Sequence, residues 1–319
     1  MTTARLGIAP PLDRPNRRWS SGRAGGVMLL LIALPCFATL PWSLTRYDRQ
    51  QTEDVADVLA APSLAEPLGT DALGRSLLWR SLLGGAISLG IGLSAAAIAV
   101  VIGVTWGMVS GYVGGRTDAL MMRTVDVLYG LPYVLLVVMV AIALQPGMQW
   151  FARRVLGGSE LVAGNAAGIV TLLVAIGGVS WLTMSRVVRG QVLSLRGQPF
   201  IEATRAVGMG PVRVLTRHLL PNLVGVIVVY ATLAVPLAIL QESFLSFLGI
   251  GVRLPLPSWG NLASEGVREL PALTNPDTPI HWWLLVFPCL LLGLTLMALN
   301  FLGDALRDRF DPRRRSGQR

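Results

Sequence analysis

The sequence contains no lysine, so all 27 of its basic residues are arginine. A Walker A phosphate-binding loop requires a lysine that reaches the β- and γ-phosphates of a nucleotide. A Schiff-base enzyme requires a lysine as its nucleophile. Both kinds of site are therefore excluded, and we expect the chain to have no ATP site of its own.

Charged residues are also scarce. They make up 14% of the 319 residues, whereas about a quarter of the residues in a soluble domain are charged. The mean hydropathy of +0.59 indicates a membrane protein. Cysteine is nearly absent: Cys36 and Cys289 lie inside apolar runs, so we interpret them as small hydrophobic side chains and not as a disulfide. The sequence shows no cluster of metal ligands.

Six long runs without charged residues are each long enough to cross a bilayer core, which needs about 20 apolar residues in a helix. A β-barrel would show short alternating segments instead. We therefore predict an all-α membrane protein with six transmembrane helices. For the first run a cleaved signal peptide is an alternative, although a signal core is normally shorter. The runs are 24–45, 81–115, 127–152, 161–185, 219–241 and 278–303.

The arginines are distributed unevenly between the two sides that six spans define. The side that holds both termini has 19 of them and the other side has 8. Because cytoplasmic segments carry the excess of arginine, we predict that both termini are cytoplasmic. This sorting also explains the net charge of +9 without a nucleic-acid partner. The predicted parts are a tail 1–23, a first transmembrane helix 24–45, a periplasmic segment 46–84, a five-helix domain 85–303 and a tail 304–319.

A polar stretch, EATRAVGMGPVRVLTRHLLPN at 202–222, lies between the fourth and fifth runs. Pro199 precedes a short helical pattern, and Gly208 suits the left-handed residue that follows a helix end. Pro211 suits the first turn of a second helix. We predict a short helix, a glycine turn and a second helix that leads into the fifth run, all on the cytoplasmic side.

The pattern alone leaves three interpretations of this stretch. A glycine turn and arginines fit a helix-turn-helix that reads DNA, but both ends of the segment are tethered to the membrane. The second interpretation is a loop that folds onto its own bundle. The third is a short helix that docks into the groove of a partner through Phe200, Ala203 and Val207, which are spaced as i, i+3 and i+7.

The stretch resembles the EAA loop of permease subunits in ABC importers. The family pattern is E-A-A, three residues, glycine, nine residues and I-x-L-P. Here threonine replaces the second alanine, and His218 takes the place of the isoleucine. The residues at matching spacing are Glu202, Ala203, Thr204, Gly208, Leu220 and Pro221.

The resemblance extends over residues 24–313 and is specific to the dipeptide and oligopeptide permeases. Ser76 stands where this family has an aspartate, and the segment 145–165 is longer than in the family. The segments that resemble these permeases are 67–85, 111–132, 188–196, 242–262 and 300–313.

The resemblance implies the transmembrane-domain fold of type I ABC importers, in the inner membrane of a bacterium. It implies a second permease subunit, two cytoplasmic ATPases that bind ATP and magnesium, a periplasmic or lipid-anchored substrate-binding protein, and a di- or oligopeptide as substrate. It also implies that this chain has no catalytic residues and no cofactor of its own, and that the loop 189–221 couples the chain to the ATPases. The residues expected at that contact are Phe200, Glu202, Ala203, Thr204, Ala206, Val207, Gly208, Leu220 and Pro221.

Two other transport functions remain as alternatives. A permease for nickel or another small solute would have the same fold. An ion-driven secondary transporter would need inverted repeats and ionisable groups near the middle of the membrane. The sequence shows no clear repeat and no acid at the midpoint of a run.

Two acidic residues lie next to apolar runs. Asp126 follows Arg123 by three residues, and we predict that the two pair on one helix face. Glu242 lies about 30 Å of helix rise beyond Asn222, and we expect it near the outer membrane boundary. Its function is either a gate at the periplasmic mouth or that of a satisfied structural acid.

The second run contains glycines at a spacing of four residues. Gly103, Gly107 and Gly111 share one face of a helix, where they permit close approach of another backbone. We predict tight packing inside a single bundle, with a subunit interface as the alternative.

Overall fold

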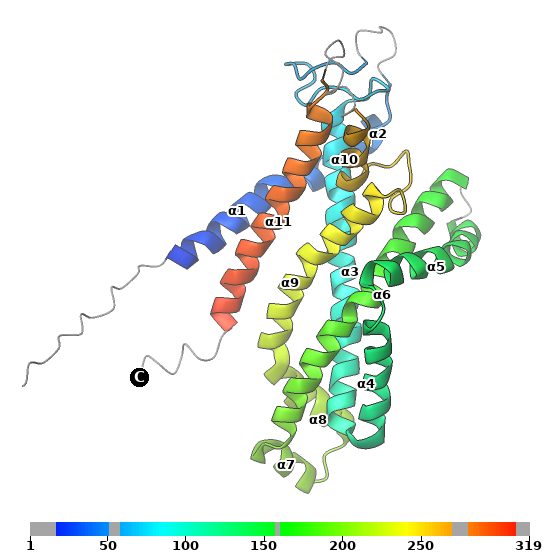
Figure 1. Cartoon of the computed structure of the whole chain (residues 1–319). Helices are drawn as coiled ribbons and strands as arrows, with labels where there is room; N and C mark the ends of the chain where they lie inside the picture. Colours follow the sequence, from blue (N-terminus) through cyan, green and yellow to red (C-terminus); the bar gives the residue numbers. More distant parts are fainter. Residues whose placement is uncertain (1–16, 51–57, 157–159, 270–279, 311–319) are drawn as a thin grey trace, which may run out of the picture.

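The computed structural model describes residues 17–50, 58–156, 160–269 and 280–310. Apart from two isolated β-bridges, regular structure in these ranges is helical (Figure 1). The helices are α1 (Arg17–Ala38), α2 (Leu40–Arg46), α3 (Leu77–Val113), α4 (Gly115–Tyr129), α5 (Tyr133–Leu156), α6 (Glu160–Arg196), α7 (Pro199–Ala206), α8 (Pro211–Val214), α9 (Leu220–Phe247), α10 (Trp259–Arg268) and α11 (Trp283–Phe310).

Five helices are long and apolar enough to cross a membrane, and a bent pair makes a sixth if it counts as one span. The bent pair is α1 and α2, which meet at an angle of 59°. Pro41 causes this break because it has no N–H to donate to the carbonyl one helical turn earlier. The predicted all-α membrane fold is thus confirmed, with five candidate spans that are each one helix and a bent pair that can make the sixth.

The third predicted span, 127–152, was wrong at its start. Residues 115–129 form the separate helix α4, and α5 begins only at Tyr133. Pro132 explains the break: it lacks an N–H and disfavours the helical conformation of Leu131 before it. The charged residues of α4 consequently stay outside the spanning helix.

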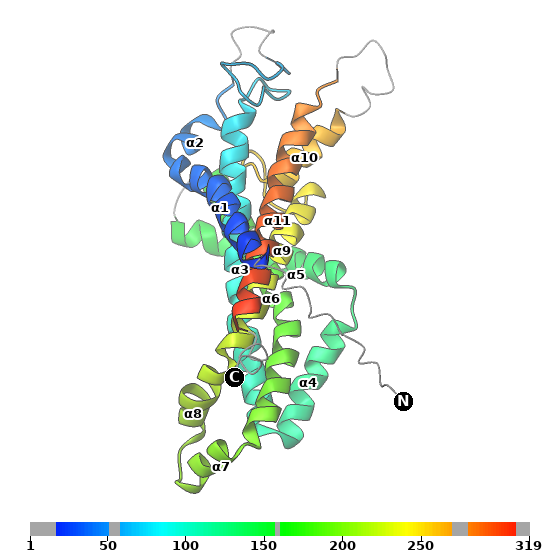
Figure 2. The same cartoon turned by 90° about the vertical axis from the view of Figure 1, so that its left-hand side faces the viewer.

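Different short helices lie at the two ends of the molecule. Figures 1 and 2 show α2, α10 and the segment 58–76 at one end, which we name the α10 end, and α7 and α8 at the other, which we name the α7 end. The start of α1 and the end of α11 are both directed toward the α7 end (Figure 1).

The glycine stripe of α3 packs against α6. A Cβ atom on Gly107 would lie 2.5 Å from the Ser185 carbonyl oxygen, and one on Gly103 would lie 2.6 Å from Met184 Cβ. A Cβ on Gly111 would lie 2.9 Å from Val192 Cβ. Only glycine permits this contact between the two backbones, so the predicted packing within one bundle is confirmed.

The short helix α10 is inserted between α3, α9 and α11 at the α10 end. Ser258 and Asn261 form a capping box at its start. The Trp259 side chain is buried and donates its indole N–H to the Ser81 carbonyl at 3.0 Å. A Cβ on Gly260 would lie only 2.0 Å from the Ser243 carbonyl oxygen. The contact of α10 with α9 is therefore a backbone-to-backbone contact.

Candidate functional site

The helix α7 is bounded by the residues that the sequence predicts. Pro199 occupies its first turn, and Gly208 follows its last residues with φ of +78°. The Met209 N–H donates to the Thr204 carbonyl at 3.0 Å, and the Gly208 N–H donates to the Arg205 carbonyl at 2.9 Å. These two bonds form a Schellman motif, which fixes the direction in which the chain leaves the helix.

One face of α7 is anchored in the bundle. Ile201 is completely buried, and Thr204, which is nearly so, donates its hydroxyl to the Ile201 carbonyl at 2.7 Å. Ile201 belongs to an apolar cluster with side chains from α3, α6 and the start of the fifth span. The buried members are Val104, Met108, Met184, Val188, Val192, Ile201, Val214, Leu219 and Leu223.

The opposite face of α7 is open. Val207 is 85% exposed and Phe200 is 40% exposed. Glu202, Ala203 and Ala206 are exposed as well. The structure therefore brings these five predicted contact residues to one free face, whereas Thr204 lies on the buried face. Leu220 and Pro221 lie on α9 instead, where Leu220 packs against the apolar cluster.

Polar contacts hold this end of the bundle together. Arg189 of α6 donates two hydrogen bonds of 2.6 Å to the two oxygens of Asp118 on α4. Ser110 of α3 also bonds to Asp118. The hydrogen bonds from Arg189 lower the pKa of the Asp118 carboxyl below its ordinary value. This ion pair joins α3, α4 and α6 next to the loop that carries α7.

Two arginines connect the α7 region to the end of α3. The guanidinium of Arg205 lies 4.7 Å from the centre of the Tyr112 ring, a cation–π distance. Arg196 donates to the Gly111 carbonyl at 3.0 Å. Sequence reasoning did not assign roles to Tyr112, Arg196 or Arg205, although they lie in the stretches 111–132, 188–196 and 202–222, which carry the resemblance.

The chain leaves α7 through a modified helix. Residues Pro211–Phe247 form one continuous helix in which Leu215–Leu219 make a π-helical turn. The Leu220 N–H donates to the Leu215 carbonyl, five residues earlier, and Pro221 has no N–H to donate. The wider turn accommodates this proline, so the predicted Leu-Pro pair marks the point where the loop that carries α7 joins the span.

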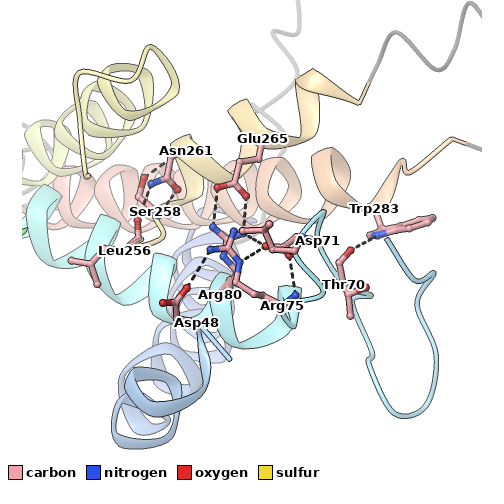
Figure 3. A network of polar contacts seen from close by, with 11 residues as sticks. Asp48, Thr70, Asp71, Arg75, Arg80, Leu256, Ser258, Asn261, Glu265 and Trp283 are labelled. Carbon is pink, nitrogen blue, oxygen red and sulfur yellow. Dashed lines mark hydrogen bonds and ion pairs between the residues drawn. The ribbon is translucent and has the colours of Figure 1, made fainter. Parts of the chain in front are cut away.

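At the α10 end, Arg80 organises a network of charges (Figure 3). Arg80 is completely buried and donates to the two oxygens of Glu265 at 2.7 and 2.8 Å. It also pairs with Asp71, whose other oxygen accepts the Arg75 N–H at 2.9 Å. Arg75 further pairs with Asp48 at 3.3 Å. Since a buried charge is costly without its partner, this network fixes the segment 58–76 and α10 to the start of α3.

Glu242 lies near the α10 end of α9 and is completely buried. Its carboxylate accepts the Ser246 hydroxyl at 2.7 Å and the Ser243 hydroxyl at 3.3 Å. Ser88 and Ser258 interact with it as well. Of the two interpretations, this placement fits a hydrogen-bonded structural acid better than a residue at an opening.

The predicted pair of Arg123 and Asp126 was wrong. Asp126 pairs instead with Arg186 of α6 at 2.7 Å. The guanidinium of Arg186 also lies 4.1 Å from the centre of the Tyr129 ring. A partner on a neighbouring helix is therefore preferred to one on the same helix.

A cavity of about 530 Å³ opens at the α10 end. Its walls come from the segment around Asp71, the end of α9, the loop after α9, and α10. The charged lining residues are Asp71, Arg75, Arg253, Glu265, Arg268 and Glu269. Within the described ranges, no group of three or more His, Cys, Asp or Glu residues is placed to hold a metal ion.

Comparison with known proteins agrees with this architecture. The family model described as "Binding-protein-dependent transport system inner membrane component" matches residues 103–316. The chain is 39% identical over 304 residues to an oligopeptide transport system permease protein of Haemophilus influenzae, covering 94% of this chain and 88% of that one. It is 41% identical over 254 residues to a dipeptide transport system permease protein of Bacillus subtilis, covering 80% and 71%.

One solved structure supports the fold. A chain of the MetNI methionine ABC transporter, in an inward-facing conformation, superposes with a TM-score of 0.51 at 20% sequence identity. The match covers 74% of this chain and 98% of that chain. At this level of identity the likeness concerns the arrangement of the helices alone.

Proposed function

Since the chain belongs to the family of binding-protein-dependent transport system inner membrane components, we propose that it is the permease subunit of an ATP-driven importer of di- or oligopeptides. As a member of this family it is a multi-pass inner-membrane protein that works with an ATPase and a binding protein. The chain forms half of the translocation path, and a second permease subunit forms the other half. Two cytoplasmic ATPases supply the energy.

The helix α7 transmits the movement of an ATPase into the bundle. The observation that carries this proposal is the contrast between its two faces: Ile201 is completely buried, whereas Val207 is 85% exposed. A partner bound to the exposed face of α7 moves the buried face with it, because the Schellman motif and the apolar cluster around Ile201 hold the helix rigidly. The displacement then reaches α3 and α6 through that cluster and the fifth span through the π-helical turn.

The α7 end faces the cytoplasm in this proposal, together with both termini. The unequal distribution of arginines supports this orientation. The direction of α1 and α11 in Figure 1 supports it as well, because the start of the first helix and the end of the last are directed toward α7. The α10 end then faces the periplasm and receives the binding protein.

Peptides are the substrate class that the relatives suggest, since the two permeases compared above are named as dipeptide and oligopeptide transport proteins. A nickel permease is the second candidate. Two charged side chains of the cavity at the α10 end, Arg253 and Arg268, have no ion-pair partner among the described residues, and both are cationic. Two arginines without an ion-pair partner repel Ni²⁺ locally and are compatible with the carboxylate of a peptide.

Reconstitution of the complete complex tests the proposal. The chain, its partner permease, the ATPases and the binding protein are assembled in proteoliposomes, and the uptake of a labelled tripeptide and of ⁶³Ni²⁺ is measured together with ATP turnover. We expect uptake of the peptide that depends on ATP and on the binding protein. Uptake of nickel without peptide would favour the second candidate, and transport without the ATPases would contradict the family-based mechanism.

The orientation has its own test. In a variant without the two native cysteines, single cysteines replace Gln198, at the α7 end, and Leu64, at the α10 end, both of which are exposed. An impermeant thiol reagent should label the cysteine at position 64 in intact cells and leave the one at position 198 unlabelled. The reverse pattern would contradict the cytoplasmic position of α7.

A further inference from the structure

We propose that Arg253 and Thr171 form a binding site for the C-terminal carboxylate of the transported peptide at the α10 end of the path. The inference rests on the proposed function and specifies which chemical group of the substrate this chain recognises. It concerns residues outside the coupling loop and outside the Arg80 network.

Arg253 lies in the loop that follows α9 and lines two cavities. One is the cavity of about 530 Å³ at the α10 end, which has the volume of a ligand pocket. The other is a small cavity of about 20 Å³ between α5, α6 and this loop. The small cavity holds about one water-sized group, such as a carboxylate oxygen. Because Arg253 lines both cavities, a ligand that places one carboxylate oxygen in the small cavity lies next to a side chain that also borders the larger one.

Two glutamines of α5 hold the guanidinium in place. With each carboxamide oxygen turned toward it, Gln145 accepts from Arg253 Nε at 3.2 Å. Gln149 accepts from Nη1 at 3.0 Å and from Nη2 at 3.1 Å. Carboxamides are neutral, so they orient the guanidinium without compensating its charge. Gln145 also contacts Nη2, and of the five N–H groups of an arginine at least one remains for an anion.

The charge of Arg253 is uncompensated within the described part of the chain. The acids of the large cavity are engaged elsewhere: Asp71 and Glu265 pair with Arg80, and Glu269 pairs with His281 at 3.2 Å. Arg268 adds a second cation to the lining. Arg253 and Arg268 are thus cations of this lining without an ion-pair partner among the described residues, and an anionic group is favoured next to them.

Thr171 supplies a second donor in the small cavity. Its side chain is only 5% exposed, and its hydroxyl has no hydrogen-bond partner within the described structure. A buried hydroxyl without a partner is uncommon and costs free energy. A carboxylate oxygen in this cavity would accept from the Thr171 hydroxyl and from Arg253, which satisfies both groups at once.

The loop that carries Arg253 is fixed on both sides. Before it, Val252 is buried and donates its N–H to the Ser246 hydroxyl at 3.1 Å. After it, the Leu256 carbonyl accepts from the Asn261 side chain at 3.0 Å. The stem of Arg253 lies against α6, where a Cβ on Gly168 would be 3.7 Å from Arg253 Cγ. The guanidinium is therefore positioned before a ligand arrives, which lowers the entropic cost of binding.

The test compares a tripeptide with its C-terminal amide in the reconstituted complex. Uptake of trialanine and of trialanine amide is measured for the wild type, Arg253→Gln, Thr171→Val and the control Arg154→Gln, which removes an exposed arginine at the end of α5 outside both cavities. The ratio of the two uptake rates, compared between variants, cancels any preference of the binding protein. Copurification of the partner subunits and ATP turnover stimulated by the binding protein are recorded in parallel.

We expect Arg253→Gln to reduce trialanine uptake about tenfold, the effect of losing one charge-assisted contact, and to leave the uptake of the amide unchanged. Thr171→Val should also reduce trialanine uptake about tenfold, the effect of one hydrogen bond to a charged acceptor, without loss of stability. Arg154→Gln should behave as the wild type. An unchanged preference in both site variants would overturn the proposal. Equal loss for both peptides with loss of the partner subunits would also overturn it and identify Arg253 as an assembly contact. If the wild-type complex hydrolyses ATP but imports neither peptide, the proposed function itself fails.

Discussion

The Ser246 hydroxyl donates a hydrogen bond to Glu242 at 2.7 Å, one helical turn earlier on α9. The same hydroxyl oxygen accepts the Val252 N–H at 3.1 Å. A buried carboxylate is thereby linked through one serine to the loop that carries Arg253. Glu242 is a positioning residue in this arrangement, because it acts on the loop and not on a ligand.

Replacement of Glu242 should separate its hydrogen bonds from its charge. Glu242→Gln keeps an acceptor for Ser246, and we expect its free energy of unfolding to stay within about 1 kcal/mol of the wild type. Glu242→Ala leaves buried hydroxyls without an acceptor and opens a cavity, so we expect a loss of about 2–4 kcal/mol. Thermal unfolding of the purified chain in detergent measures both. Equal destabilisation by the two variants would show that the charge itself is required.

The ion pair of Asp118 and Arg189 predicts a pH dependence. Because Arg189 lowers the pKa of Asp118 from the ordinary value of 3.8, the pair stabilises the fold above that pH, and its contribution is lost as the pH falls toward the lower folded-state pKa. The wild type should therefore have a higher Tm than Asp118→Asn at neutral pH. The difference should shrink between about pH 5 and pH 3. A difference that stays constant over this range would contradict the role of the pair.

Local features were predictable from the sequence because they depend on neighbouring residues. Charge-free runs predicted the spans, and the left-handed conformation of Gly208 followed from its place after a short helical pattern. The glycine stripe of α3 predicted a close backbone contact, which α6 provides. Each of these inferences needed the periodicity of one helix and no knowledge of its partner.

The remaining features depend on contacts between residues that are far apart in the sequence. Arg80 pairs with Glu265, 185 residues later in the chain. Asp126 pairs with Arg186, 60 residues away, and not with Arg123 on its own helix. The site around Arg253 likewise combines a loop with α5 and α6. The signal in the sequence was the presence of charged residues next to apolar runs. Such residues require partners, but the sequence does not identify those partners.

Two glycines of α3 provide a matched test of the packing between α3 and α6. At Gly107 an added side chain would meet the Ser185 carbonyl at 2.5 Å, whereas at Gly90 it would meet nothing within 4 Å. We expect Gly107→Val to lose folded protein, measured as the monodisperse fraction after detergent extraction, because the backbones would have to separate. Gly90→Val should yield as much as the wild type. Similar yields from both variants would contradict the close contact.

The exposed face of α7 should carry the affinity for the ATPase. Phe200→Ser combined with Val207→Ser removes the two large apolar side chains that are exposed at the start and the end of α7 and leaves Ile201 in place. Val212→Ser is the control, since Val212 of α8 is 71% exposed and outside the predicted contact. We expect the double variant to copurify with about tenfold less ATPase at an unchanged Tm, as for a pair of interface hot spots. Unreduced copurification would place the ATPase contact elsewhere.

Gly208 offers the sharpest test of coupling, because its role depends on backbone conformation alone. A Cβ there would meet nothing within 4 Å, but the φ of +78° is strained for most side chains. Asparagine tolerates this conformation, whereas a β-branched residue does not. Gly208→Val should therefore displace the exit from α7, and Gly208→Asn should preserve it.

The measurement is the number of peptides imported per ATP hydrolysed by the reconstituted complex. We expect Gly208→Asn to keep the wild-type ratio. Gly208→Val should lower the ratio severalfold while the chain still folds, since the strain of about 1–2 kcal/mol acts on a turn outside the spanning helices. If the valine variant transports as many peptides per ATP as the asparagine variant, α7 does not couple the ATPase to the bundle. The loop would then be a connection folded onto its own protein, as one reading of its pattern allows.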